Sequence, residues 1–206
     1  MKNLLKKILL SIPAIKDYCE FKKSLTNKVT FLQYISFKLS RNKRIYWPVH
    51  SNSEVTHPEN IYVGINTNPG TRPGCYIQGN GGIYIGDYCR FASNIGIISA
   101  NHDLYDHTKH NNNPIRLDKY CWVGQNVMIM PGVTLGPRTI VGAGSVVTHS
   151  FPEGFCVIAG NPAKLIKRLD PSKFKPMDFG VEYYGYIPKK QFQKFAKKYS
   201  IDTHLF

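Results

Sequence analysis

A strict six-residue repeat of aliphatic side chains constrains this chain more than any other feature. Stepping by six from Leu117 meets only aliphatic residues, at Val123, Ile129, Leu135, Val141 and Val147. Four residues beyond each of these lie mostly small or β-branched residues, namely Cys121, Val127, Val133, Thr139, Ser145 and Phe151. The period of an α-helix is about 3.6 residues and that of a strand about 2, so neither produces a repeat of six.

The repeat predicts a prism of stacked short strands. Each unit makes a strand and a turn, and three units make one coil of about 18 residues, with the aliphatic side chain pointing inward. Glycine follows the aliphatic at Gly124, Gly136 and Gly142, where we expect a cramped or positive-φ turn position. An antiparallel sandwich would show hairpin signals about every 8–12 residues, which this segment lacks. The fold class is therefore an all-β core, a parallel β-helix.

One polar segment interrupts the repeat. The same phase occurs upstream at Ile85, Phe91 and Ile97, yet the repeat resumes at Leu117 rather than at Ile115. The intervening residues are polar and end in turn formers. We expect a loop at residues 100–114 that is expelled from one edge of the prism, where functional residues are commonly placed.

Charge divides the chain into three parts. Residues 1–50 hold eleven of the 27 Lys and Arg residues, residues 161–206 hold ten, and the middle is near neutral. We therefore expect a basic helical arm at 1–50, the β-helix at 51–162, and a basic helical or irregular tail at 163–206. The arm has helical periodicity at Leu5, Ile8, Leu9, Ile12 and Ile15 and again from Phe31 to Leu39. Its helices either pack on the rest of the chain or contact a membrane surface peripherally.

Several classes are disfavoured. No segment approaches the roughly 20 apolar residues of a transmembrane helix, and the short Ile8–Ile15 segment contains Pro13 and no cleavage site. Five cysteines without CxxC spacing suggest reduced thiols in a cytoplasmic protein and no zinc site. No nucleic-acid-binding motif is visible, so we expect no nucleic-acid partner.

The motifs resemble those of the hexapeptide-repeat acyltransferases. The resemblance rests on Trp122-Val123-Gly124, the segments 131–136 (PGVTLG), 141–148 (VGAGSVVT) and 159–164 (AGNPAK), and the expelled histidine loop. The resemblance extends over about residues 61–168. Within the family, the chain is similar to galactoside and maltose O-acetyltransferases and to sugar O-acetyltransferases of capsule and O-antigen pathways. It implies a left-handed β-helix, a homotrimer, acetyl-CoA in a groove between adjacent subunits, and no metal.

The resemblance places the family's catalytic histidine at His102. Acetyl transfer to a hydroxyl needs a base with a pKa near neutral, which histidine supplies. His107 and His110 share the loop and either contact the acceptor or are solvated. The ring of His102 needs an orienting partner, for which Asp103, Asp106 and a backbone carbonyl are all candidates.

The resemblance also implies a set of contacts to acetyl-CoA. Trp122 would project outward over the pantetheine or the acceptor, or else lie at the trimer interface. Gln125, Ala143 and Thr148 match pantetheine contacts, and Lys164, Lys167 and Arg168 match cations near the nucleotide phosphates. Asn80 and Asp103 are candidate acceptor contacts, although Asn68-Pro69-Gly70-Thr71-Arg72 departs from the pattern of the galactoside enzymes.

The function expected is O-acetylation of a sugar hydroxyl, in surface polysaccharide biosynthesis, by a cytoplasmic enzyme that is soluble or peripheral to the inner membrane. Alternatives are an N-acetyltransferase for amino sugars, an acetyltransferase for xenobiotics, or a trimeric scaffold without activity. A γ-type carbonic anhydrase would need three histidines across adjacent coils, whereas His102, His107 and His110 share one loop.

Overall fold

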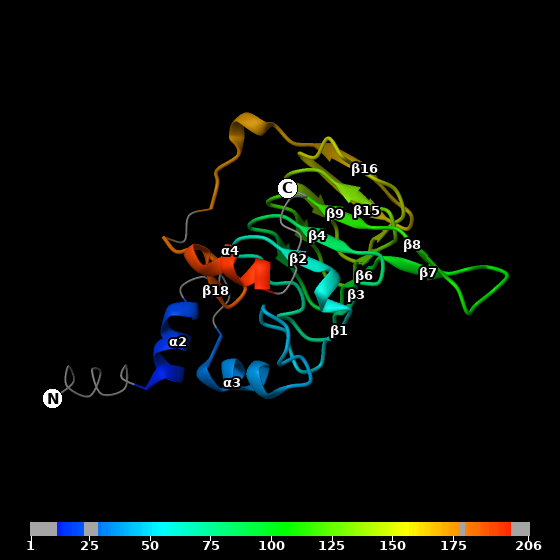
Figure 1. Ribbon diagram of the computed structural model, residues 1–206. Helices are drawn as coiled ribbons and strands as arrows, with labels where there is room; N and C mark the ends of the chain where they lie inside the picture. Colours follow the sequence, from blue (N-terminus) through cyan, green and yellow to red (C-terminus); the bar gives the residue numbers. More distant parts are fainter. Residues whose placement is uncertain (1–11, 23–28, 178–179, 199–206) are drawn as a thin grey trace.

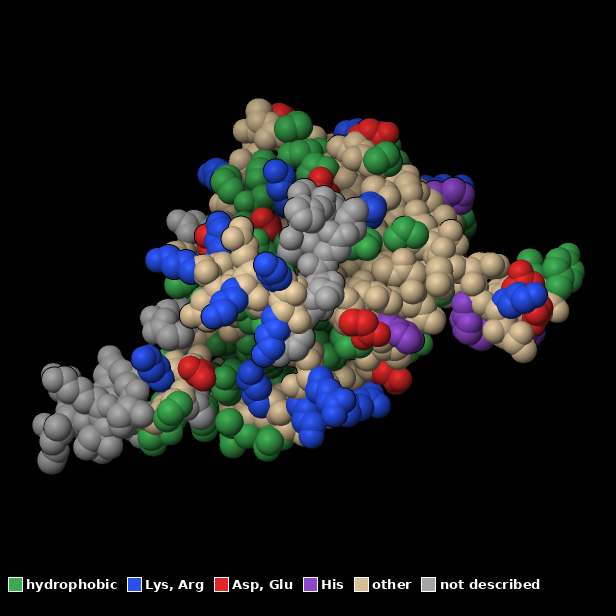
Figure 2. Space-filling view, viewed as in Figure 1, with side chains coloured by type: hydrophobic (Ala, Val, Ile, Leu, Met, Phe, Trp, Pro, Cys, Tyr) green, Lys and Arg blue, Asp and Glu red, His purple; other side chains and the backbone are tan. Residues whose placement is uncertain are grey.

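A column of short strands forms the centre of the molecule, and its helices gather toward one end of that column (Figure 1). The computed structural model describes residues 12–22, 29–177 and 180–198. Lys and Arg side chains gather over the helices in Figure 2, whereas the strand column carries few of them on this face.

Three sheets, in which all strands but the one at residues 163–168 pair in parallel, form the walls of a prism. The first sheet consists of β1 (Glu54–Thr56), β3 (Tyr76–Gln78), β6 (Gly96–Ile98), β11 (Met128–Ile129) and β14 (Val146–Val147). The second consists of β2 (Ile61–Val63), β4 (Ile83–Ile85), β9 (Ile115–Leu117) and β12 (Thr134–Leu135). The third consists of β5 (Arg90–Phe91), β10 (Trp122–Val123), β13 (Thr139–Val141), β15 (Cys156–Gly160) and β16 (Ala163–Arg168). From β4 to β6, and again from β9 to β11 and from β12 to β14, the chain passes from the second sheet to the third and then to the first.

Strand register reproduces the six-residue repeat. Val123 pairs with Val141, and Ile129 pairs with Val147, so each residue stacks on its counterpart one coil away. Leu117 pairs with Ile85 on one side and with Leu135 on the other, across the interruption. The repeat aliphatics of the second coil onward are at most 1% exposed. The predicted left-handed parallel β-helix is confirmed.

Close approach between coils, rather than positive φ, explains the glycine that follows the aliphatic. A Cβ on Gly124 would lie 2.7 Å from the Ala143 backbone nitrogen and 2.8 Å from the Val141 oxygen. The positive φ falls two residues later in the unit, at Asn126, Arg138 and Gly144 among others. The sequence had left both explanations open, and the structure separates them.

The interruption is more regular than the predicted loop. Residues 100–102 form β7 (Ala100–His102), which pairs with β8 (His110–Asn112) in an antiparallel hairpin. This hairpin projects away from the column (Figure 1). Pairing between β7 and β8 satisfies backbone polar groups of this projecting segment.

The N-terminal helices pack beside the first coils. They are α2 (Pro13–Phe21) and α3 (Phe31–Leu39), and α3 begins at a capping box formed by Thr30 and Gln33. Phe21, Tyr34 and Phe37 form a separate buried cluster, against which Tyr186 packs. The expected helical positions Leu5, Ile8 and Leu9 lie outside the described residues.

The C-terminal segment returns along the prism. Residues 163–168, expected to be helical or irregular, instead extend the third sheet as β16, which runs antiparallel to β15. The hairpin β17 (Tyr183–Tyr184) and β18 (Ile187–Pro188) and the helix α4 (Lys189–Lys198) then cover the second sheet. Phe192 of α4 stacks on Tyr184 at 3.8 Å between ring centroids and packs against Tyr62 of β2. The described part of the chain also holds the short 3₁₀ helices η2 (Pro58–Asn60) and η3 (Pro171–Lys173).

Candidate active site

His102 ends β7 in the projecting hairpin. It pairs in register with His110 of β8, and both residues are exposed. The neck of the hairpin is fixed to the prism by a hydrogen bond from the Asn113 amide to the Ser99 carbonyl oxygen, at 2.9 Å. The hairpin leaves the edge between the first and second sheets, since it follows β6 and precedes β9.

A backbone carbonyl orients the imidazole of His102. Its Nδ1 lies 2.8 Å from the carbonyl oxygen of His107. A carbonyl can only accept, so Nδ1 carries the hydrogen and Nε2 keeps a lone pair. The ring of His110 lies 4.3 Å from that of His102, between centroids. Of the three candidates for the orienting partner, the structure favours the carbonyl.

The two aspartates instead stabilise the turn of the hairpin. Asp103 Oδ1 accepts from the Tyr105 and Asp106 amides at 2.9 and 3.0 Å. Asp106 accepts from Thr108 and pairs with Lys109 at 3.0 Å. These hydrogen bonds hold the pKa of both carboxyl groups below the ordinary value. The carboxylate of Asp103, expected to contact acceptor, is thus already engaged within the loop.

Thr148 and Asn80 lie at the same edge of the prism as His102. Thr148 follows β14, and its Oγ1 lies 2.8 Å from His149 Nδ1. Asn80 lies in the turn between β3 and β4, one coil before the hairpin. The next residue, Gly81, donates its amide to Ser99 Oγ at 2.9 Å, which ties this turn to the neck of the hairpin.

The other expected contacts to acetyl-CoA lie on the third sheet and its border with the first. Trp122 is 53% exposed, whereas Val123 next to it is fully buried, as the predicted outward orientation requires. Gln125 and Ala143 occupy successive turns between the third and first sheets, where the Gly144 amide donates to the Gln125 carbonyl oxygen at 2.8 Å. These turns lie on a different edge from His102, so one copy of the chain does not bring the two groups together.

Lys164, Lys167 and Arg168 follow one another along β16 and are exposed. Lys167 and Arg168 line a cavity of about 310 Å³ together with Arg138, Lys173 and Phe174. Arg138 also stacks on the Phe174 ring, at 5.4 Å from its centroid. This end of the third sheet is therefore strongly cationic.

A second cavity, of about 570 Å³, lies beside Trp122 on the third sheet and includes residues that the sequence did not single out. Arg72, Arg90 and Arg138 line it, together with Tyr88, Tyr120, Trp122 and Gln125 among others. The three arginines come from different coils and fall outside the repeat positions. The six-residue pattern therefore gave no signal for them.

Comparison with known proteins agrees with this architecture. The family model "Bacterial transferase hexapeptide (six repeats)" matches residues 114–149. Residues 114–149 therefore carry a hexapeptide repeat of the bacterial transferase type. The resemblance to hexapeptide-repeat acyltransferases, given above on the motifs, is confirmed.

Among curated relatives of this hexapeptide-repeat protein are two galactoside O-acetyltransferases. That of Lactococcus lactis subsp. lactis (strain IL1403) is 31% identical over 102 residues, which cover 48% of this chain and 49% of the relative. That of Escherichia coli (strain K12) is 33% identical over 92 residues, which cover 43% and 45%. The matches thus span about half the length of these curated relatives.

Two solved structures share the fold over most of their length. A maltose O-acetyltransferase from Clostridium difficile 630 is 27% identical with a TM-score of 0.53, and the match covers 81% of this chain and 89% of that one. A galactoside acetyltransferase in complex with coenzyme A is 20% identical with a TM-score of 0.57, over 82% and 88% of the two chains.

The described part of the chain has neither a metal-binding cluster nor a membrane-spanning helix. Residues 12–22, 29–177 and 180–198 contain no group of three or more His, Cys, Asp or Glu side chains placed to hold a metal ion. The same described ranges include no helix long and apolar enough to cross a membrane.

Proposed function

We propose that this hexapeptide-repeat protein transfers the acetyl group of acetyl-CoA to a sugar hydroxyl, with His102 as the general base. The observation that carries the proposal is the hydrogen bond between His102 Nδ1 and the His107 carbonyl oxygen, which leaves Nε2 free to accept a proton. Relatives named galactoside and maltose O-acetyltransferases support the reaction and the class of acceptor.

The chemistry follows from that tautomer. Nε2 takes the proton of the acceptor hydroxyl as its oxygen attacks the thioester carbonyl carbon. The tetrahedral intermediate then breaks its carbon–sulfur bond, and the imidazolium returns the proton to the departing CoA sulfur. His107 stabilises the imidazolium throughout, because its carbonyl oxygen faces the Nδ1 hydrogen in both protonation states.

The acetyl-CoA site would be shared between two copies of the chain. Trp122, Gln125 and Ala143 would bind the pantetheine from one copy, and Thr148 and His102 would approach from another copy. Lys164, Lys167 and Arg168 would bind the nucleotide phosphates. A solved relative that holds coenzyme A supports this ligand. The homotrimer is the closed assembly that repeats one such contact three times.

The cellular role extends the proposal to surface polysaccharides. A cytoplasmic enzyme that acetylates their precursors would work beside the inner membrane. Leu32 and Leu39 of α3 are 80% and 76% exposed, and Lys38, Arg41 and Arg44 lie on or just after the same helix. Exposed apolar side chains beside cations suit peripheral contact with an anionic membrane surface.

The test is release of CoA thiol from acetyl-CoA in the presence of a panel of neutral, amino and acidic sugars. We expect thiol release that depends on the sugar, with product mass increased by one acetyl group. Acetylation at nitrogen only would replace the O-acetyl proposal by an amino-sugar reaction. No acetylation of any sugar, by pure protein that binds acetyl-CoA, would contradict it.

A further inference from the structure

The charged side chains that line the cavity of about 570 Å³ beside Trp122 are all positive. Three of its lining side chains are arginines, at positions 72, 90 and 138, and its described lining includes no Asp or Glu. We call it the arginine pocket. Its volume is within the range of about 300–1,000 Å³ that is typical of small-molecule sites.

We propose that the arginine pocket binds an anionic group of the acceptor, so that the substrate is a sugar carrying a phosphate or carboxylate. This inference rests on the proposed function for the reaction itself. It adds the class of acceptor, for which the galactoside-type pattern gave no guide in this chain.

The fold holds the side chains of Arg90 and Arg138 in place. Arg90 Nη1 donates to the Asn66 carbonyl oxygen at 2.8 Å, and its Nη2 lies 3.8 Å from Met177 Sδ. Burial lowers the pKa of the Arg90 guanidinium, because the low-polarity walls disfavour its charge. An anion in the pocket would offset this cost. Guanidinium groups also match phosphate and carboxylate geometry with two parallel hydrogen bonds.

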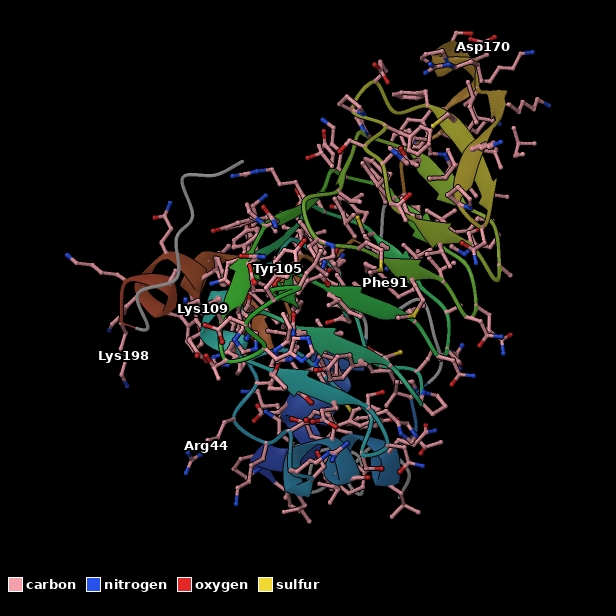
Figure 3. The ribbon with its side chains drawn as sticks, turned by 90° about the vertical axis from the view of Figure 1, so that its right-hand side faces the viewer. Arg44, Phe91, Tyr105, Lys109, Asp170 and Lys198 are labelled. Carbon is pink, nitrogen blue, oxygen red and sulfur yellow. The ribbon has the colours of Figure 1, made fainter. Side chains whose placement is uncertain are left out.

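Aromatic rings provide the wall for the uncharged part of the ligand. Tyr88 and Tyr120 stack with their centroids 5.1 Å apart and their planes 10° apart. Both line the pocket, as do Phe91 and the exposed Trp122, so in the proposed site Trp122 would contact this ligand as well as the pantetheine. Flat apolar faces beside a few fixed polar groups are typical of sites that orient a small ring-shaped ligand. In Figure 3, Phe91 lies to the right of Tyr105 and Lys109, which belong to the projecting hairpin.

The pocket is separable from the cations of β16. Lys167 and Arg168 line the other cavity, and Arg138 is the residue that the two cavities share. Arg72 and Arg90 line the arginine pocket but not the other cavity, and they are therefore the arginines that we assign to the acceptor side of the proposed acetyl-CoA path. The hairpin of a second copy would bring His102 to this side, as the shared site requires.

The experiment compares glucose, glucuronic acid and glucose 1-phosphate, by calorimetry without acetyl-CoA and then as acceptors. We expect at least one of the two anionic sugars to bind about 10- to 100-fold more tightly than glucose, the range of a charge-assisted hydrogen bond. Which anion is favoured distinguishes a carboxylate from a phosphate acceptor. Arg72→Gln and, independently, Arg138→Gln should remove this preference.

Arg44→Gln is the matched control, because it removes one positive charge from an exposed position remote from Phe91 and the pocket (Figure 3). It should leave the preference for anionic sugars unchanged. Thermal unfolding of each variant checks that the β-helix is intact, and Arg72→Lys should restore part of the anion affinity.

The outcomes separate this inference from the proposed function. Equal binding of glucose and both anions would overturn the arginine pocket, even if sugars are acetylated. Loss of acetyl-CoA affinity in Arg72→Gln, with sugar affinity unchanged, would also overturn it. Binding of an anionic sugar that depends on Arg72, without any turnover, would support the pocket and contradict the acetyltransferase proposal.

Discussion

At the scale of single residues, the informative contact is the one between an imidazole and a main-chain carbonyl. Asp103 is the neighbour of His102 in sequence, yet its carboxylate accepts from two loop amides and not from the imidazole. The proton on Nδ1 is instead fixed by His107 at 2.8 Å. Since a carbonyl oxygen can only accept a hydrogen bond, this contact specifies the tautomer of His102 that carries its hydrogen on Nδ1.

His102→Ala should lower kcat by about 10²–10⁴-fold while acetyl-CoA still binds. His107→Ala keeps the carbonyl and should retain most of the activity. Steady-state rates and CoA titration check both variants. A His102→Ala enzyme with the wild-type rate would exclude His102 as the base.

Asp103→Ala should lower kcat, because the turn that positions His102 loses two amide contacts. Asp103→Asn keeps an acceptor oxygen and should lower kcat only slightly.

The pKa of Asp103 is lowered in the fold. The contribution of this carboxylate to stability is therefore complete above its unfolded pKa and is lost as pH falls through the folded value. The protection of the Tyr105 and Asp106 amides from hydrogen exchange should therefore not change with pH near neutrality. A raised KM for sugar in Asp103→Asn would indicate acceptor contact instead.

At the scale of elements, the coil is determined by how closely neighbouring backbones approach. The residue after each inward aliphatic meets the next coil directly, as at Gly124. The turn residue with positive φ is Asn126 in one coil, Arg138 in another and Gly144 in the same coil as Arg138. The residue after the inward aliphatic is therefore limited by the space between coils, and the turn residue is limited by its backbone conformation.

Gly124→Ala should destabilise the fold by about 3 kcal/mol, because its Cβ would clash with the Ala143 and Val141 backbone. Gly144→Ala is the matched control: its φ is +70°, nothing lies within 4 Å of an added Cβ, and we expect a cost of about 1 kcal/mol. Chemical denaturation of both variants measures the difference. Equal costs would mean that close approach between coils does not select glycine.

At the scale of the whole molecule, the site residues lie on separate edges of one prism. His102 and Thr148 border the second sheet, whereas Gln125 and Ala143 border the third. A closed prism has a packed interior, so residues on two of its edges do not meet across it. Assembly of copies side by side is the arrangement that would join them.

Copies of His102→Ala and Trp122→Ala, each with little activity at limiting acetyl-CoA, should regain activity when co-expressed. Random mixing would combine an intact His102 with an intact Trp122 in about one quarter of shared sites. The comparison is with each variant expressed alone. Absence of any recovery, in mixed assemblies shown by mass, would place the whole site within one copy.

Lys164→Ala should raise the KM for acetyl-CoA about 10-fold with little change in kcat, since a phosphate contact acts on binding and not on the reacting bond. Lys190→Ala on α4 removes an equivalent charge and serves as the control. Equal affinity of the wild-type protein for CoA and dephospho-CoA would argue against contact with the 3′-phosphate.

The sequence by itself determined the fold, because the six-residue repeat is a local pattern that each coil satisfies against its neighbour. The inward positions, the strand phase and the place where His102 leaves the prism all follow from it. Only the tertiary structure decided which group holds the His102 ring and which arginines share a cavity. The arginine cavity brings together residues of different coils, and the His102 contact joins a side chain to a backbone carbonyl. The six-residue repeat determines neither of these contacts.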